Sequence, residues 1–187
     1  MDKRILKTKS CLRSALLKLM NDYSLADITV TEICKESNTG RNTFYTYYED
    51  KYALLQDCFR EFERETKEAF EERQRTMNPE KELAKSFQNL LDVLIDLRTE
   101  YVFLNDFNDL DMMMMYYHFI SESLAKFEET EAKFLADSFD LKQLNSFFAL
   151  GFWGFLHGNP TLSTEQTKKN AHYLIKTLTA GKLVNNN

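Results

Sequence analysis

The sequence predicts an all-α protein, on three observations. Five glycines and two prolines among 187 residues leave few positions for tight hairpins and favour long helices over a sheet. Apolar residues recur at helical spacing along most of the chain. Two capping boxes, Thr29 with Glu32 and Ser163 with Gln166, mark helix starts. The length suits one compact core, or two small units that share a helix.

Three helices are expected near the N-terminus. The first covers residues 3–21, where one apolar stripe alternates with basic positions. The capping box at Thr29 starts a second, short helix over residues 30–36. The turn after it places Asn38 where a left-handed backbone is needed, and the third helix follows over residues 41–47.

The remaining helices are expected to be longer. Asp50 can cap a fourth helix that runs toward residue 75. Further helices are predicted over residues 83–95, 113–126 and 141–157, and from the Ser163 capping box to residue 181, for about nine in total. We therefore expect a helix-turn-helix domain over residues 1–50 and a helical body over residues 51–187.

The charge distribution agrees with a DNA-binding N-terminus. The whole chain has a formal net charge of −5, which by itself argues against a polyanionic partner. Residues 1–51, however, hold nine Lys and Arg against seven Asp and Glu, while residues 52–187 are net negative. The helix-turn-helix pattern, whose second helix enters the major groove of DNA, lies in the positive part.

Particular residues in this part resemble the signature of the TetR (tetracycline-repressor) family. The matching residues are Ile-Thr-Val-Thr-Glu-Ile at 28–33, Thr-Phe-Tyr-Thr-Tyr-Tyr at 43–48, Lys51, and Leu54 with Leu55. The likeness extends over nearly the whole of residues 5–60, without a gap. One departure is that Gly40 replaces the usual Ser, so the third helix loses a hydroxyl cap. The resemblance implies a homodimeric transcriptional regulator, either a repressor or an activator, on palindromic double-stranded DNA.

Four residues of the signature are expected to contact DNA phosphates. Thr29 lies at a helix N-terminus, where free amides and the helix dipole attract anions. Tyr45 and Tyr47 can donate their phenol hydroxyls to phosphate oxygens, and Lys51 adds a positive charge at the start of the fourth helix.

Three residues of the third helix are candidates for reading bases. Arg41 can form a fork with guanine, Asn42 can pair with adenine, and Thr43 can touch a thymine methyl. Phe44 and Tyr48, four residues apart on one face, are interpreted instead as core aromatics.

The C-terminal body carries a candidate dimer interface. The resemblance implies that the last two long helices pair with those of a second chain as a four-helix bundle. Gly151 and Gly154 would let backbones approach closely, while Phe152 and Phe155 would fill the flanks. Ordinary packing within one chain is the alternative for these residues.

An aromatic and Met-rich segment is a candidate effector pocket. Met adapts to irregular apolar ligands, so a small apolar molecule could lie among Tyr101, Phe107, Met112, Met115 and Tyr116. The alternative is a plain hydrophobic core, which such stripes more often form. The resemblance implies that an effector would tilt the fourth helix and release DNA.

Other classes of protein are disfavoured by the sequence. The three scattered cysteines form no C-x-x-C pair, which indicates reduced thiols and a cytoplasmic setting. No apolar run approaches the ~20 residues of a membrane span, so no membrane partner is expected. No Glu-x-x-His tetrapeptide occurs, and neither catalysis nor a cofactor is expected. A helical-bundle enzyme and a protein-interaction module without DNA binding remain the alternatives.

Overall fold

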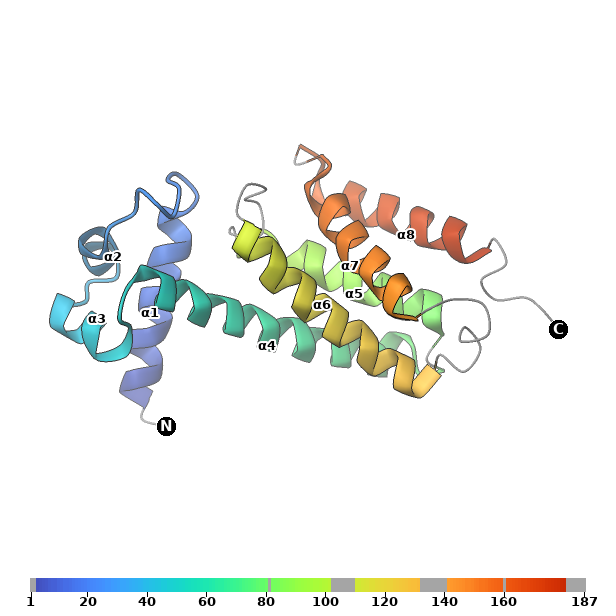
Figure 1. The fold of residues 1–187 in the computed structure, drawn as a ribbon, viewed down its shortest axis with the longest axis horizontal. Coiled ribbons are helices and arrows are strands. Elements are labelled where there is room, and N and C mark those ends of the chain that lie inside the picture. The colour runs from blue at the N-terminus through green and yellow to red at the C-terminus, as the bar shows by residue number, and fades with distance from the viewer. Residues whose placement is uncertain (1–2, 81, 102–109, 132–140, 160, 181–187) are drawn as a thin grey trace. The chain divides into compact units, whose positions relative to one another are not determined.

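The computed structural model describes residues 3–80, 82–101, 110–131, 141–159 and 161–180 (Figure 1). This part of the chain holds eight helices and no strand, so the all-α prediction is confirmed and the expected total of about nine was close. The chain divides into two units. Unit 1 comprises Met1–Glu65 with Glu100–Leu104, and unit 2 comprises Thr66–Thr99 with Asn105–Asn187.

Unit 1 contains the three N-terminal helices and the beginning of the fourth. These are α1 (Lys3–Leu19), α2 (Val30–Glu36), α3 (Arg41–Tyr47) and the first part of α4 (Lys51–Met77). The two short helices match their predicted spans residue for residue. Figure 1 shows α1 beside α2, and α2 beside α3.

One apolar core joins these four helices. Its fully buried side chains are Leu12 and Leu16 of α1, Ile33 of α2, Phe44 of α3, and Leu54, Cys58 and Phe62 of α4. Because α4 supplies part of this core, unit 1 extends to Glu65, past residue 50. Cys34 is buried as well, whereas Cys11 is exposed on α1.

The turn between α2 and α3 has the predicted chemistry. Asn38 has a φ of 50°, a left-handed conformation that Asn tolerates better than most residues. The backbone N–H of Thr39 donates to the carbonyl of Cys34 at 2.9 Å, which closes the turn. Gly40 precedes α3 without a side-chain cap, so the loss of a hydroxyl cap is confirmed.

Unit 2 is built from the end of α4 and four later helices, α5 (Leu83–Leu97), α6 (Leu110–Glu131), α7 (Leu141–His157) and α8 (Thr164–Ala180). Within this unit α5 packs against α8, and α6 packs against α7. The Phe87 and Phe148 rings stack with centroids 4.2 Å apart in its core. The predicted span of α7 is confirmed, while α6 extends beyond both ends of the predicted helix.

Candidate nucleic-acid interface

The start of α2 is a complete capping box. The Thr29 hydroxyl accepts from the backbone N–H of Glu32 at 3.3 Å, and the Glu32 carboxylate accepts from the Thr29 backbone N–H at 2.8 Å. The Thr29 hydroxyl also donates to this carboxylate at 2.7 Å. The hydrogen bonds from the Thr29 hydroxyl and amide hold the pKa of Glu32 below its ordinary value. The predicted capping box is confirmed, and a phosphate approaching exposed Thr29 therefore meets a carboxylate already at this helix end.

Lys51 ties the loop before α2 to the start of α4. Its ammonium group donates to the carbonyl oxygens of Ala26 and Ile28, both at 2.7 Å. An ammonium group has three donors, so one N–H is left for a phosphate oxygen. Because Ile28 precedes Thr29 directly, the structure brings the predicted phosphate contacts Thr29 and Lys51 to the same corner of unit 1.

The outer side of α3 presents the predicted base-reading residues. Arg41, Asn42 and Thr43 are exposed, as is Tyr45. The Arg41 guanidinium lies 6.0 Å from the centroid of the Tyr45 ring, so these two side chains share one face. Tyr47 is half-buried. The first turn of α3 is therefore open to solvent.

The inner side of α3 is anchored by aromatic residues. Phe44 is fully buried and Tyr48 nearly so, with ring centroids 5.8 Å apart. Their interpretation as core residues is confirmed. The hydroxyl of Tyr48, however, has a polar role that the sequence did not show.

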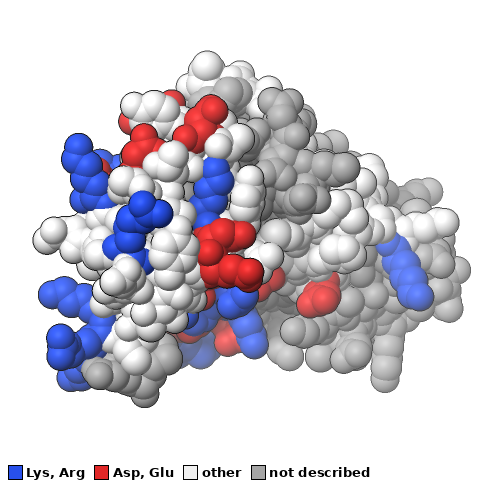
Figure 2. All heavy atoms as spheres, turned by 60° about the vertical axis from the view of Figure 1, so that its left-hand side comes forward, with Lys and Arg blue, Asp and Glu red and all other residues white. Residues whose placement is uncertain are grey.

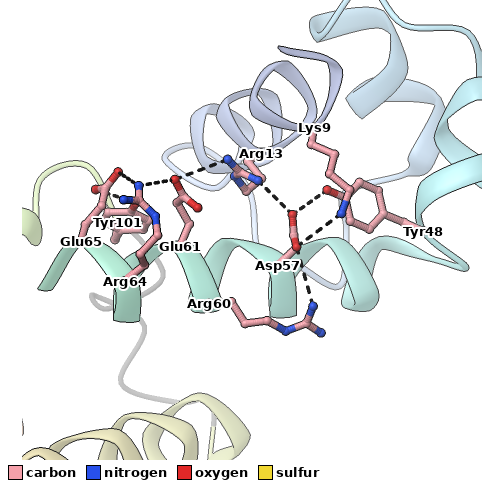
Figure 3. Close-up of polar contacts among 9 residues, drawn as sticks. All are labelled: Lys9, Arg13, Tyr48, Asp57, Arg60, Glu61, Arg64, Glu65 and Tyr101. Carbon is pink, nitrogen blue, oxygen red and sulfur yellow. Dashed lines mark hydrogen bonds and ion pairs between the residues drawn. The ribbon is translucent and has the colours of Figure 1, made fainter. Parts of the chain in front are cut away.

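Asp57 of α4 accepts hydrogen bonds from two neighbouring elements (Figure 3). The Tyr48 hydroxyl donates to its carboxylate at 2.7 Å and the Arg13 guanidinium at 3.0 Å, while the Lys9 ammonium lies 3.8 Å away. Burial alone would raise the pKa of Asp57, but the hydrogen bonds from Tyr48 and Arg13 and the charge of Lys9 outweigh it and lower the pKa. Asp57 thus links α1, the residue after α3, and α4.

Basic side chains gather on unit 1. Figure 2 shows several Lys and Arg side chains, with Asp and Glu between them, over the face of this unit that comes forward in the view. The 17 residues of α1 include six Lys or Arg and no Asp or Glu. α1 therefore adds a strongly basic segment to unit 1.

Comparisons with known proteins identify the fold. A TetR-family transcriptional regulator from Syntrophomonas wolfei str. Goettingen matches with a TM-score of 0.75 at 14% sequence identity, over 96% of this chain and 98% of that one. A TetR transcriptional regulator from Streptococcus agalactiae 2603V matches with a TM-score of 0.58 at 21% identity, over 93% and 96% of the two chains. The chain has the TetR fold. No family model matches its sequence.

One curated relative shares a short segment with this TetR-fold chain. The two are 38% identical over 45 residues, and the relative is an uncharacterized HTH-type transcriptional regulator, YxbF, of Bacillus subtilis (strain 168). The segment spans 24% of this chain and 12% of the length of the relative. The likeness to that protein is therefore confined to a small part of it.

The predicted pocket residues of this TetR-fold chain are not gathered in one unit. Tyr101 belongs to unit 1, where its ring packs on Phe62 and its hydroxyl donates to Glu65 at 2.9 Å. Met115 and Tyr116 lie on α6 in unit 2. Phe107 and the side chain of Met112 fall outside the described residues. Within the described part, no group of three His, Cys, Asp or Glu could hold a metal ion, and no helix is long and apolar enough to cross a membrane.

The predicted dimer residues point in different directions. Phe152 is buried among the rings of Phe87 and Phe148, so its packing is within the chain. Gly151 and Gly154 are exposed, and a Cβ added to either would meet no atom within 4 Å. Phe155 is half-buried. Phe152 therefore packs within the chain, which was the alternative to a dimer interface for this segment.

Two residues on the exposed side of α7 were missed by the sequence. Phe147 is 60% exposed and Leu150 is 50% exposed, and they share the helix face of Gly151 and Gly154 because all four follow helical spacing. The apolar residues of α7 surround the helix, so periodicity alone could not separate its core side from its outer side.

Replacing Tyr116 with Phe is expected to stabilise unit 2. Tyr116 is 1% exposed and its hydroxyl has no hydrogen-bond partner among the described residues. A buried, unsatisfied polar group costs about 1 to 3 kcal/mol, and Phe removes it with little change of shape. Chemical denaturation should show a free energy of unfolding raised by about 1 kcal/mol.

The matched control is Tyr101→Phe, which removes a hydroxyl that donates to the Glu65 carboxylate. It should lower the free energy of unfolding by about 1 kcal/mol or more. A loss of stability in both variants would mean that the Tyr116 hydroxyl is satisfied in solution.

Proposed function

We propose that this chain is a transcriptional regulator that binds duplex DNA through α2 and α3. The observation that carries the proposal is the two-sided character of α3, in which Phe44 is fully buried while Arg41, Asn42 and Thr43 are exposed in the first turn. Recognition helices are anchored on one side in this way and read base edges with the other. The TetR fold and the basic character of α1 support the same function.

We assign separate roles to the residues of this face. Thr29, Tyr45, Tyr47 and Lys51 contact phosphates, which fixes the register of the protein on the duplex. Arg41, Asn42 and Thr43 contact bases and therefore set sequence preference. For Lys51, the contact uses the ammonium N–H that Ala26 and Ile28 leave free.

The proposed active form is a homodimer that uses α7 and α8. The α7 face of Phe147, Leu150, Gly151 and Gly154 leaves large apolar area in water, which a second copy would cover. On α8, Tyr173 and Leu174 are exposed as well. A two-fold dimer presents two copies of α3, which can read an inverted repeat whose half-sites are about 34 to 36 Å apart.

An effector that acts through unit 2 is the proposed means of control. α4 contributes residues to both units, so a ligand that favours one position of α4 would also change where α3 can dock. The energy of this coupling equals the difference in ligand affinity between the two states of the dimer. The hydroxyl of Tyr116, which has no hydrogen-bond partner among the described residues, favours a small, mainly apolar ligand with one hydrogen-bonding group.

Two single substitutions test the DNA-binding assignment. Lys51→Ala should weaken binding to all duplexes alike, whereas Arg41→Ala should relax base preference at one position and cost about 1 to 3 kcal/mol on the preferred site. Both are measured on a duplex selected from a random pool by the wild-type protein, and on a scrambled duplex of equal length.

The matched control is Lys67→Ala, which removes an exposed Lys of α4 within unit 2. It should leave both affinities unchanged. If the wild-type protein enriches no duplex, or if neither unit 1 variant alters binding, the chain is a helix-turn-helix module with another partner.

A further inference from the structure

The basic residues of α1 fall into two groups. Lys9 and Arg13 pair with Asp57, and Lys18 pairs with Glu36. The other group consists of Lys3, Arg4 and Lys7, all exposed in the first two turns of the helix. Lys9, Arg13 and Lys18 thus pair with carboxylates of α2 and α4, whereas Lys3 and Lys7 have no ion pair among the described residues.

The second group occupies an unfavourable place for cations. The first turn of a helix carries the positive end of its dipole, so basic side chains there are repelled. Lys3 and Lys7 are also four residues apart, the spacing at which like charges on a helix destabilise one another. The first turn of α1 contains no acidic residue to offset either effect. A polyanion lying along this side of α1 would attract these cations and so offset both repulsions.

The N-terminal half of α1 lies near the end of α3. The Lys9 ammonium lies 5.2 Å from the centroid of the Tyr48 ring, and Tyr48 directly follows α3. The N-terminal half of α1 is therefore beside the C-terminal end of α3. The opposite end of α1 lies beside α2, because Lys18 pairs with Glu36 there.

We propose that Lys3, Arg4 and Lys7 form a second phosphate-binding surface, which holds the DNA backbone just beyond the end of α3. The proposal rests on the proposed function, and it adds one side of α1 to the surface that contacts DNA. The occupant is duplex DNA because the cations are exposed and closely spaced, and because they lie in the half of α1 that is near the end of α3. These contacts read no bases, so they add affinity without adding sequence preference.

The test is the full-length Lys3→Gln, Lys7→Gln double variant, in which Gln removes charge and keeps chain length. Binding to a fluorescent mixed-sequence duplex is followed by anisotropy over a range of salt concentrations. The slope of log affinity against log salt should become shallower by about 2 to 4, since each lost phosphate contact contributes about 0.9 and a dimer loses up to four. Affinity at roughly 0.1 M salt should fall at least about tenfold. The thermal midpoint should stay the same or rise, because repulsion within α1 is relieved.

The control double variant is Lys67→Gln, Lys85→Gln, which removes the same charge from unit 2. It should keep the wild-type salt dependence. An unchanged slope in the α1 variant, or an equal loss in both double variants, would overturn the phosphate surface while the proposed function stands. A wild-type protein that binds no duplex at any salt concentration would overturn both. Should the double variant unfold, the single Lys7→Gln variant is measured, with half the slope change expected.

Discussion

Replacing Leu150 with Lys is expected to turn the proposed dimer into a monomer and to lower affinity for an inverted-repeat duplex by about 10²- to 10⁴-fold. Leu150 lies at the centre of the exposed α7 face, between Phe147 and the two glycines. A lysine there would place an unpaired charge in an apolar interface, and that cost is larger than most single contacts can offset. Affinity falls because a dimer bound at one half-site holds its second copy of α3 close to the other half-site, whereas a monomer does not.

Light scattering after gel filtration gives the mass of the variant, and anisotropy gives its affinity. A duplex with a single half-site serves as the reference, since the Leu150→Lys variant and the wild-type protein should bind it with the same low affinity. The control is Met77→Lys, which changes an exposed apolar residue at the end of α4 and should keep the wild-type mass. A Leu150→Lys protein that is still dimeric would place the interface on another face.

Replacing Asp57 with Ala is expected to lower the free energy of unfolding at neutral pH by about 2 to 4 kcal/mol. The Asp57 side chain is 13% exposed, and its removal leaves the Tyr48 hydroxyl and the Arg13 guanidinium without their shared acceptor. Since Tyr48 follows α3 directly, DNA affinity should fall as well. Tyr48→Phe should lower the free energy of unfolding by less. The two effects should not add, because both substitutions break the same hydrogen bond between Tyr48 and Asp57.

The effect of Asp57 should depend on pH in a defined direction. Its pKa is lower in the folded protein than the ordinary value of about 3.9, so the unfolded chain binds the proton more readily. The stability that Asp57 contributes is therefore fully present above about pH 4 and is lost as pH falls through the folded pKa. Urea titrations at pH 7 and near pH 3 should show the difference between wild type and Asp57→Ala shrinking at the lower pH.

A comparison variant, Glu71→Ala, removes an exposed carboxylate that lies 3.9 Å from Lys67. It should change stability by less than about 0.5 kcal/mol at either pH. If Asp57→Ala behaved like Glu71→Ala, the contacts of Asp57 with α1 and Tyr48 would be too weak to hold α3 in place.

Local signals in the sequence predicted the helices of unit 1 well. The capping box at Thr29 and the left-handed Asn38 each depend on residues within a few positions of one another, so their geometry can be inferred without knowing the fold. The exposed residues of α3 were also predictable, because Phe44 and Tyr48 mark the buried side at helical spacing.

The features that the sequence did not reveal depend on contacts between distant segments. Asp57 looks like an ordinary charged residue of an amphipathic helix until α1 and Tyr48 are placed around it. Lys51 was predicted to contact phosphate, but its bonds to Ala26 and Ile28 arise only when α4 meets the loop before α2. For Phe152 and Leu150 the difficulty was an apolar α7 with no polar side to orient it.

The uneven burial of the three cysteines has a practical consequence. Cys34 and Cys58 are buried, and burial raises both pKa values, that of Cys58 to about 12, so neither forms a thiolate readily near neutral pH. Cys11 is exposed on α1. A maleimide spin label or fluorophore should therefore attach at one position per subunit of the natural sequence. In the proposed dimer, the distance between two such probes would report the separation of the two copies of unit 1, with and without effector.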